Sequence, residues 1–328
     1  MRPDPHVFIV SCKVDLATDA VVKALNRRSI RCTRFNTEDF PFDVSLTVRF
    51  SHGTGVRRSI LQQSPRIASP IDDISSVWYR RVRAPERPED ISPGVYEYCV
   101  REAGAALLGS LLCLETAVMS CPDRVWAAEH KLLQLATAQI SGLRIPETVV
   151  TNLPAEVRST FNLFSGRMIA KPVRSGFVDS GGEQRAIYTT QILEEHLEHL
   201  GSVQWSPAIY QPLVEKACDV RVTIVGQKLF VAEIDSQTDP EAAVDWRKTS
   251  NPALPHRRAS LPEDVSLRLK SLMQRLRLAF GCIDLIRTPS GEYIFLEVNP
   301  NGQWLWLDDL LGFGISDEIA GWHLDQVH

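Results

Sequence analysis

Two short apolar segments near the end of the chain each contain one acidic residue, and this pattern constrains the fold more than any other. The segments are 282–286 (CIDLI) and 293–298 (YIFLEV), and Arg-Thr-Pro-Ser-Gly-Glu joins them. Proline and glycine favour a tight turn, so the stretch is predicted to form a β-hairpin. Asp284 lies on the first strand and Glu297 on the second. Asn299 comes two positions after Glu297 and is therefore expected on the same face of its strand.

The oxygen atoms of these three side chains are suited to a hard cation. An acid inside so apolar a segment is unfavourable unless it is paired or bound to a metal. Asp284, Glu297 and Asn299 are therefore candidate ligands of Mg²⁺, which takes such oxygen ligands when it also holds phosphate groups. The alternative is a pair of edge-strand acids that face water.

The composition is that of an ordinary globular protein, with 44% hydrophobic and 23% charged residues in a chain of 328. At about 150 residues per domain, this length predicts two or three domains. The net charge of −4 gives no electrostatic reason to expect nucleic-acid binding. The seven cysteines lack the spacing of a zinc site or a disulfide framework. Neither a signal-peptide pattern nor an apolar run of about 18 residues is present, so we expect a cytoplasmic protein that binds no membrane.

The first 122 residues are expected to form a small α/β domain. An apolar strand at 7–11, an amphipathic helix at 17–29 and a strand at 31–35 give β–α–β order, which favours a parallel sheet. Hairpin-like segments, VSLTVRF and VRRSILQQ, come next, and a long helix is predicted over 95–120. Ser-Cys-Lys follows the first strand in place of a glycine-rich fingerprint, so a dinucleotide site of the Rossmann type is not expected.

A lysine on a short strand marks the second block, residues 123–215. The block opens with a predicted helix over 124–142, which Gly142 closes. Lys171 lies in the apolar strand RMIAKPV, and a turn rich in glycine and serine follows over 174–182. The backbone N–H groups of such a turn and a flexible cation can both face a phosphate. An ordinary turn between strands is the alternative.

An arginine in a strand-like segment opens the third block, residues 216–328. Arg221 lies in CDVRVTIV, with Asp219 just before it. Arg221 is either a functional cation or a structural arginine that its neighbours satisfy. Asp-Trp-Arg, a predicted helix over 262–281 and the acidic hairpin follow.

The order of these features resembles that of the ATP-grasp superfamily: a strand lysine with a glycine loop, an arginine strand after an apolar connector, and a late Asp…Glu-x-Asn hairpin. More closely, the chain resembles the ATP-grasp ligases that mature ribosomally made peptides, the graspetide or microviridin-type macrocyclases. The closer match is carried by FNTEDFP (35–41) with SVWYRR (76–81), by residues 129–152, and by FLEVNPNGQWLWLD (295–308). Few ATP-grasp enzymes continue Glu-x-Asn into Asn-Gly-Gln-Trp-Leu-Trp, and the resemblance spans nearly the whole chain.

The resemblance implies an α/β (α+β) protein with the ATP-grasp fold in three lobes. Residues 1–122 would form an N-terminal pre-ATP-grasp α/β domain, and residues 123–215 a central domain with the phosphate loop. Residues 216–328 would form a C-terminal domain with the Mg²⁺ hairpin. ATP would bind between the last two domains.

The resemblance also implies roles for individual residues. Lys171, Arg221 and Arg247 would be catalytic: Lys171 on the α- and β-phosphates, Arg221 near the transferring phosphate and Arg247 near the acyl-acceptor site. The backbone of a hinge would pair with adenine, and one of two acids would lie near the ribose. The implied nucleotide-binding positions are Lys131, Lys171, Ser175, Gly176, the hinge residues Gln211, Pro212, Leu213 and Val214, and the acids Glu215 and Asp219.

The implied activity is ATP-dependent macrocyclisation of a ribosomal precursor peptide. An Asp or Glu side chain of the peptide would become an acyl phosphate, with release of ADP, and would then be joined to a Thr or Ser hydroxyl or to a Lys amine. Attacker and phosphate are both anions, so the chemistry needs Mg²⁺, Lys and Arg around the transfer. The alternatives are a ligase that adds free amino acids to a protein tail or a small acid, and a catalytically silent peptide-binding protein. The sequence does not distinguish ester from amide formation.

The implied partner is a precursor peptide with a leader and a core, and a homodimer is compatible with the sequence. A helix predicted over 190–201 has an acidic face that is suited to an arginine of the leader, with a solvated helix face as the alternative. The acids of this face are Glu194, Glu195 and Glu198. Trp304 and Trp306 either line the core-peptide pocket or fill the core beneath the hairpin, and strand-like alternation predicts that both face one way.

Overall fold

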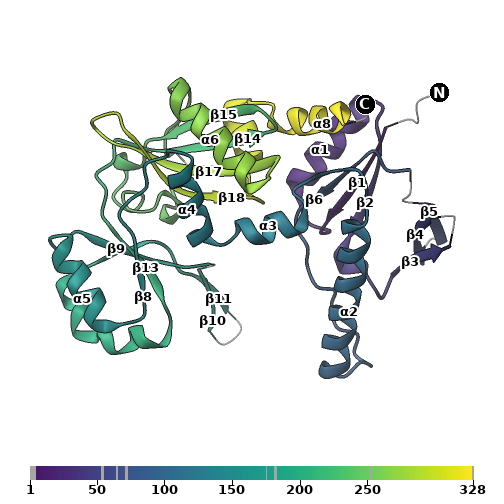
Figure 1. The fold of residues 1–328 in the computed structure, drawn as a ribbon, viewed down its shortest axis with the longest axis horizontal. Helices are drawn as coiled ribbons and strands as arrows, with labels where there is room; N and C mark the ends of the chain where they lie inside the picture. The colour runs from purple at the N-terminus through teal and green to yellow at the C-terminus, as the bar shows by residue number, and fades with distance from the viewer. Residues whose placement is uncertain are drawn as a thin grey trace. The chain divides into compact units, whose positions relative to one another are not determined.

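The chain divides into two units, and each has sheets of its own (Figure 1). The computed structural model describes residues 5–52, 55–63, 66–70, 73–174, 176–180, 183–251 and 253–326. Unit 1 comprises Met1–Asp123, Gln303–Asp308 and Gly314–His328, and unit 2 comprises Arg124–Gly302 and Asp309–Phe313. The structure thus groups two segments of the expected last domain, 216–328, with the N-terminal residues, and the three-domain division itself stays a prediction.

Unit 1 contains a parallel sheet in the order β2-β1-β6-β7. Its elements are β1 (His6–Ser11), α1 (Leu16–Arg27), β2 (Arg31–Asn36), β6 (Ser76–Tyr79), β7 (Ala117–Met119) and the last helix, α8 (Ile315–Asp325). Every residue of β1 is buried, as befits a central strand covered on both faces. The predicted β–α–β unit is confirmed, and α8 packs against α1.

A second, antiparallel sheet and a long helix complete unit 1. They are η1 (Thr37–Asp39), β3 (Val44–Ser51), β4 (Gly55–Gln63), β5 (Arg66–Pro70) and α2 (Pro93–Leu112). The sheet order β3-β4-β5 confirms the hairpin-like reading of this region. The helix predicted over 95–120 is wrong in its last part. Residues 117–119 form β7 instead, because they pair with β6 and bury Met119 in the sheet.

The first sheet of unit 2 has the order β12-β9-β13-β8. A separate two-stranded hairpin, β10–β11, lies between β9 and β12 in the sequence. The elements are α3 (Pro122–Ala128), α4 (Lys131–Ile140), β8 (Val149–Thr151), α5 (Pro154–Leu163), β9 (Met168–Pro172), β10 (Phe177–Ser180), β11 (Glu183–Ala186), β12 (Thr190–Ile192), η2 (Glu194–Trp205) and β13 (Ala208–Pro212).

Two helices predicted in this part of the chain are wrong in detail. The helix expected over 124–142 is two helices, because His130 adopts an extended conformation (φ −81°, ψ 105°) and starts α4 afresh at Lys131. The helix expected over 190–201 begins as strand β12, which pairs with β9. The remainder is the 3₁₀ helix η2, which is kinked at His199.

The second sheet of unit 2 is antiparallel, in the order β16-β15-β14-β17-β18. Its elements are β14 (Cys218–Val225), β15 (Lys228–Ile234), η3 (Ser236–Thr238), η4 (Trp246–Lys248), β16 (His256–Ala259), α6 (Glu263–Leu276), β17 (Phe280–Arg287) and β18 (Tyr293–Asn299), and α7 (Leu305–Leu311) follows. The predicted hairpin is confirmed as β17–β18. The helix expected over 262–281 ends at Leu276, because Arg277 takes a left-handed conformation and Phe280 starts β17.

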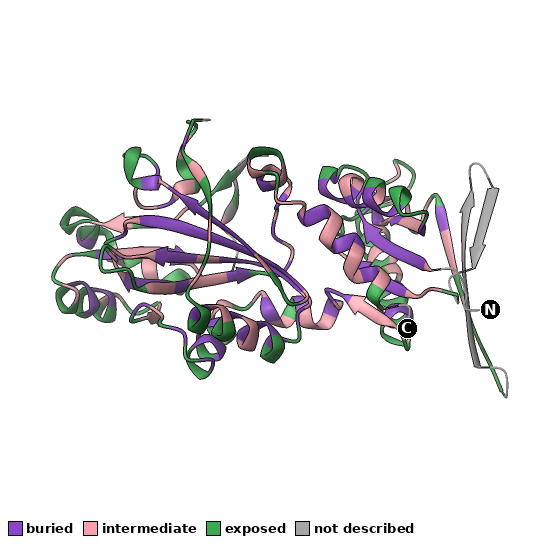
Figure 2. Cartoon of the chain, turned by 90° about the horizontal axis from the view of Figure 1, so that it is seen from above, coloured by how far each residue is buried: buried purple, intermediate pink, exposed green. Residues whose placement is uncertain are grey.

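This sheet separates an apolar face from a charged one. Val220, Val222 and Ile224 alternate along β14 and pack with Leu269 and Leu272 of α6 in the main core of unit 2. The intervening residues of β14 therefore point to the opposite face, and so do their cross-strand partners. Figure 2 shows the long strands of unit 2 as buried along most of their length. Within the described residues, no helix combines the length and apolarity needed to span a membrane.

Candidate functional site

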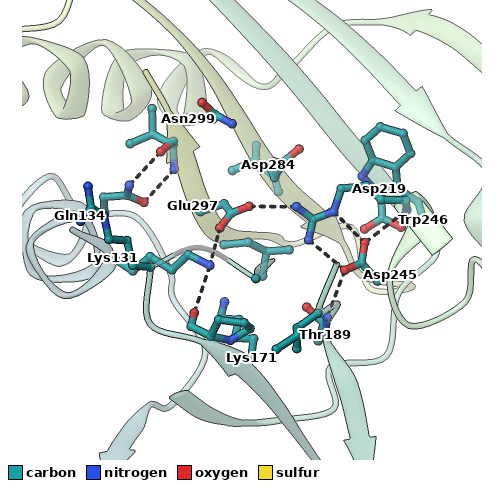
Figure 3. Close-up of a pocket in the computed structure, with 18 of the residues that line it drawn as sticks. Lys131, Gln134, Lys171, Thr189, Asp219, Asp245, Trp246, Asp284, Glu297 and Asn299 are labelled. Carbon is teal, nitrogen blue, oxygen red and sulfur yellow. Dashed lines mark hydrogen bonds and ion pairs between the residues drawn. The ribbon is translucent and has the colours of Figure 1, made fainter. Parts of the chain in front are cut away.

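A cavity of about 530 Å³ opens in unit 2, within the size range of small-molecule sites. Residues from both sheets of the unit and from α4 line it (Figure 3). Cations and carboxylates alternate around it, so the cavity is polar rather than a gap in an apolar core. Its lining includes the charged side chains of Lys131, Lys171, Arg247, Asp219, Asp245, Asp284 and Glu297.

The two hairpin acids lie at the centre of the charged face. Asp284 is the cross-strand partner of Glu297 on one side and of Arg221 on the other. Arg221 Nη1 donates to both carboxylate oxygens of Asp284, at 2.9 and 2.8 Å. Burial raises the pKa of Asp284, and the nearby Glu297 adds to the rise, so that Arg221 does not fully offset them. Asp284 is therefore the acid with the raised pKa, and it lies beside Glu297, whose pKa is shifted in the opposite direction.

Glu297 is the better ionised of the pair. Its carboxylate lies 3.1 Å from Lys131 Nζ and 3.6 Å from Arg247 Nη1 (Figure 3). Burial alone would raise the pKa of Glu297, but Lys131, Arg247 and Lys171 outweigh it and lower the pKa. Lys131 Nζ also donates to the carbonyl of Pro172, at the end of β9. The first residue of α4 therefore links β9 to the hairpin.

Lys171 is a buried cation without a full counter-charge of its own. Burial lowers its pKa to about 8, Glu297 opposes this, and Lys131 and Arg247 reinforce it. A lysine in this state gains from the arrival of an anion, because the anion supplies the missing counter-charge. The described geometry therefore favours a polyanionic ligand, such as a nucleotide phosphate chain, beside β9.

Asp245, which sequence reasoning missed, orients Arg247. It caps η4, and its two carboxylate oxygens accept bonds from Arg247 Nε at 2.9 Å and from Nη2 at 2.8 Å. These bonds raise the pKa of Arg247, and Arg247 in turn lowers the pKa of Asp245 against the effect of burial. Asp245 also accepts from the backbone N–H of Thr189. The only sequence signal was an acid two positions before an arginine at a helix start.

Two further residues hold the hairpin in place. Gln134, on the buried face of α4, donates to the carbonyl of Val298 at 2.8 Å and accepts from its N–H at 2.9 Å. This pair fixes the backbone between Glu297 and Asn299. Gly302 packs closely against Cys282 and Arg221. A Cβ at this position would come within 2.6 Å of Cys282 Sγ and 3.2 Å of Arg221 Nη2. A buried glutamine inside an apolar helix face and the glycine of Asn-Gly were the available sequence signals.

The residues present fit Mg²⁺. Asp284, Glu297 and Asn299 line the same cavity and offer two carboxylates and one amide oxygen. Among the described residues no group of three or more His, Cys, Asp or Glu side chains forms a metal cluster. An ion held here would therefore complete its oxygen shell with phosphate or water, which is the usual arrangement for Mg²⁺.

The hinge predicted over 211–214 borders a smaller cavity of about 50 Å³, which shares Lys171 and Thr189 with the larger one. Pro212 has no N–H, and the N–H of Leu213 donates to the carbonyl of Arg167. Neither Pro212 nor Leu213 can therefore donate to a base, and Val214 is the next hinge residue whose N–H could do so. The Gln211 side chain is fully buried, donates to Thr148 Oγ1 at 2.8 Å and leaves its carbonyl oxygen without a partner. That oxygen is an acceptor suited to an exocyclic amine.

Of the two acids expected near the ribose, only Asp219 lines the cavity. Lys216 Nζ donates to it at 2.7 Å, and burial outweighs this cation and raises the pKa of Asp219. Glu215 is exposed. Gly176 lines the cavity, and a Cβ there would collide with the carbonyl of Ile187, so the close approach needs glycine. Ser175 lies outside the described residues.

Residues 6–124 match the family described as the MvdD pre-ATP grasp domain. Among solved structures, a RiPP-associated ATP-grasp ligase from Chryseobacterium gregarium, in complex with ADP and a leader and core peptide, is similar at 28% identity, with 98% of this chain and 97% of that chain covered and a TM-score of 0.91. Macrocyclase MdnC from Microcystis aeruginosa, bound with precursor peptide MdnA, is similar at 28% identity over 98% and 99% of the chains, with a TM-score of 0.86.

Macrocyclase MdnB from Microcystis aeruginosa reaches 30% identity over 98% of this chain and 99% of its own, with a TM-score of 0.79. The chain belongs to the graspetide, or microviridin-type, family of ATP-grasp ligases. It has the ATP-grasp fold with a pre-ATP-grasp domain. No curated protein sequence matches it.

The residues of this ATP-grasp ligase that were expected to meet the peptide are not among those that line the charged cavity. Glu194, Glu195 and Glu198 are exposed on η2. Trp304 is fully buried in unit 1, where it packs on Trp78, so the structure favours the core-filling alternative for it. The expectation that Trp304 and Trp306 face one way is wrong, because residues 305–311 form helix α7 rather than a strand.

Proposed function

We propose that this ligase is an ATP-dependent macrocyclase of a ribosomally made precursor peptide. It activates Asp or Glu side chains of the peptide as acyl phosphates, releases ADP, and joins each acyl group to a Thr or Ser hydroxyl or to a Lys amine. The reaction consumes ATP, and we place it in the cytoplasm. Family membership, and relatives that are macrocyclases or hold ADP with a leader and core peptide, support the proposal.

The observation that carries the proposal is the charge arrangement of the cavity. The two hairpin acids are each partnered by a cation that also suits a phosphate: Asp284 by Arg221, and Glu297 by Lys131 and Arg247. A nucleotide bound to its metal ion can replace these internal ion pairs. Its phosphates can pair with the cations, and its metal ion can pair with the acids. The site is thus charged and paired before the ligand arrives, which limits the reorganisation needed for transfer.

Three of the cations have distinct tasks in the proposed reaction. Lys171, partly deprotonated near pH 8, becomes fully charged against the phosphates. Arg247 is oriented by Asp245 and faces the cavity. It is placed to offset the charge of the peptide carboxylate, or the charge of the phosphoryl group that this carboxylate attacks. Arg221 stays on Asp284 and fixes its orientation. Mg²⁺ bound by Asp284, Glu297 and Asn299 would neutralise phosphate charge and align the phosphoryl group with its attacker.

We further propose that the exposed acids of η2 receive a basic leader segment of the precursor. The support is their exposure and their like charge on one short helix. Glu195→Lys should weaken precursor binding without changing ADP binding, because the acid takes no part in the charged cavity. Glu156→Lys, an exposed acid on α5, is the matched control and should leave both affinities unchanged.

The reaction is tested by mass spectrometry together with nucleotide analysis. The enzyme is incubated with ATP, Mg²⁺ and a precursor peptide encoded beside it. Each ring should lower the mass of the peptide by one water and convert one ATP to ADP and phosphate. Deleting the leader should lower the rate sharply, because the leader supplies the binding that positions the core carboxylate.

Other outcomes would assign the chain differently. A peptide that gains the mass of an amino-acid residue would indicate an amino-acid ligase. AMP as the product would indicate adenylation and would contradict the acyl-phosphate route. Peptide binding without any nucleotide turnover would indicate a silent binding protein.

A further inference from the structure

One wall of the smaller cavity presents a buried amide. Gln211 lies on β13, two positions after Ile209, which is the cross-strand partner of Lys171. Residues in this relation share one face of a sheet, so Gln211 and Lys171 both point into the smaller cavity, which they line. The Gln211 side chain is fully buried, and its carbonyl oxygen has no donor among the described residues. A buried acceptor without a donor is unfavourable, which indicates that a ligand supplies the donor.

A threonine hydroxyl fixes which end of this amide faces the cavity. Thr148 Oγ1 donates to the carbonyl of Pro146 at 2.8 Å. The same oxygen atom accepts a bond from Gln211 Nε2, also at 2.8 Å. Because a hydroxyl has one proton, Thr148 can only accept from Gln211 while it donates to Pro146. Turning the amide would place two acceptors against each other, so the carbonyl oxygen of Gln211 stays on the side away from Thr148.

The surroundings of this oxygen suit the flat ring of a purine base. The smaller cavity is lined from both sheets of unit 2, by Ile169 of one sheet and by Ile286 and Leu296 of the other. Such apolar side chains suit the faces of an aromatic ring, while polar groups such as the Gln211 amide read its edge. The smaller cavity shares Lys171 and Leu296 with the larger one, so a nucleotide can extend from one cavity into the other.

We propose that Gln211, held by Thr148, selects adenine over purines that carry an oxygen at position 6; this inference rests on the proposed use of ATP. The 6-amino group of adenine is a donor and fits the Gln211 oxygen. Hypoxanthine and guanine carry a carbonyl there, which would face Gln211 as a second acceptor. A site built around a buried hydrogen bond rejects a ligand that cannot form it, because both groups then stay unpaired. Thr148 is thus a positioning residue, since it acts on the base through Gln211.

Calorimetric titration of the full chain with ADP and with inosine diphosphate, both in the presence of Mg²⁺, tests the proposal. The two bases differ at position 6 and in the proton on the adjoining ring nitrogen. The wild type should bind ADP about 100-fold more tightly than inosine diphosphate. Gln211→Leu should lower this ratio to about 10 or less, because it removes the acceptor.

Thr148→Val should also lower the ratio to about 10 or less, but in a distinct way. Without the hydroxyl, the amide of Gln211 can turn its NH₂ group toward the base, which suits the carbonyl of hypoxanthine. The variant should therefore bind inosine diphosphate more tightly than the wild type does, a gain that general damage to the fold cannot produce. Thr148→Ser keeps the hydroxyl and should keep the wild-type ratio.

The matched control is Thr137→Val on α4. The Thr137 hydroxyl also donates to a backbone carbonyl, that of Leu133, and the described lining of neither cavity includes Thr137. This variant should keep the wild-type ratio. Equal affinities of the wild type for the two nucleotides would overturn the proposal, and a wild-type ratio in Thr148→Val would overturn the role of Thr148.

The titrations do not depend on macrocyclisation. A preference for ADP in a chain that forms no ring would support the selection of adenine and contradict the proposed reaction. Equal affinities in a chain that forms rings with ATP would do the reverse. Binding of neither nucleotide would overturn both.

Discussion

Each unit of the molecule contains a buried Arg–Asp pair, and the two pairs differ in what surrounds them. In unit 1, Arg80 Nε donates to Asp15 at 2.9 Å, and its guanidinium lies 4.1 Å from the centre of the Trp304 ring. In unit 2, Arg221 donates to both oxygens of Asp284, which lines a cavity beside a second acid. The pairs look alike in geometry but have opposite electrostatic character.

The difference appears in the carboxyl groups. Burial works to raise the pKa of Asp15, yet Arg80 and Thr18 outweigh it, and the pKa is lowered. The pKa of Asp284 is raised by burial and by Glu297 in spite of Arg221. Folding therefore favours the charge on Asp15 and disfavours the charge on Asp284. A charge that lowers the stability of the fold and lies in an open cavity is typical of a functional group. A charge that raises the stability of the fold in a closed core is structural.

Turnover should distinguish the two pairs most strongly. Asp284→Asn removes one of the two charges proposed to bind Mg²⁺ while keeping the size of the side chain, so macrocyclisation should fall by about 1,000-fold or more. Asp15→Asn should leave the rate per folded molecule within about 3-fold of the wild type, because Asp15 lies outside the cavity. The measurement is the rate of ADP formation with saturating precursor. Equal losses in the two variants would remove the distinction between the pairs.

Stability should respond in the opposite sense. Asp15→Asn leaves Arg80 buried without its counter-charge and should lower the free energy of unfolding by about 3 kcal/mol. Asp284→Asn should lower it by less, because the fold disfavours that charge and Glu297 remains close to Arg221. Chemical denaturation at pH 7 measures both. A larger loss of stability in Asp284→Asn than in Asp15→Asn would contradict this assignment.

A smaller effect should come from the backbone that closes over Arg221. Gly302→Ala forces a methyl group against Cys282 and Arg221, so the pair with Asp284 should shift and activity should fall by about 10- to 100-fold. Gly321→Ala, on α8, meets nothing within 4 Å and serves as the control. It should keep full activity and gain slightly in stability. Steady-state kinetics and thermal unfolding of the two variants test this.

A weaker response, to pH, is expected from a buried histidine in unit 1. His323 packs beside Trp78 and its Nδ1 lies 2.8 Å from Ser76 Oγ, and burial lowers the pKa of His323 to about 3. The unfolded chain takes up this proton near pH 6.5, whereas the folded chain does not. Stability from this group is therefore complete above pH 6.5 and is lost, by up to about 1.4 kcal/mol per pH unit, as the pH falls toward 3.

His323→Gln tests this response, because it keeps a polar side chain without the titration. Denaturation at pH 7 and pH 5.5 should show a smaller drop for the variant than for the wild type. The same slope in both proteins would mean that His323 is not kept neutral by the fold.

The parts of the fold that the sequence predicted are those with strong local patterns. The hairpin β17–β18 and the β–α–β start follow from apolar alternation and turn residues, and both are confirmed. The apolar pattern continues through His130 and through residues 117–119, so local reasoning could not place the break before α4 or the strand β7. The environments of Arg80 and Arg221 could not be predicted from the sequence either. Both arginines follow or occupy apolar strands, and what distinguishes them is a distant residue: Trp304 for one and Glu297 for the other.

The site was predictable in its residue types and less so in its arrangement. Lys131, Lys171, Arg247 and the three oxygen-bearing residues of the hairpin do line one cavity, while their functional roles stay a prediction. Asp245, Gln134 and Gly302 left only weak signals in the sequence, because each acts by orienting another residue through contacts that only the folded chain creates.

We propose that the hairpin acids form a metal-dependent nucleotide site, and calorimetric titration with ADP tests this assignment. Titrations of the wild type and of Glu297→Gln are each run with and without Mg²⁺. Mg²⁺ should strengthen ADP binding to the wild type by about 10-fold or more, and this gain should disappear in Glu297→Gln, whose fold is checked by circular dichroism. An equal gain from Mg²⁺ in both proteins would mean that the metal binds without Glu297, and the hairpin would then not be the metal site.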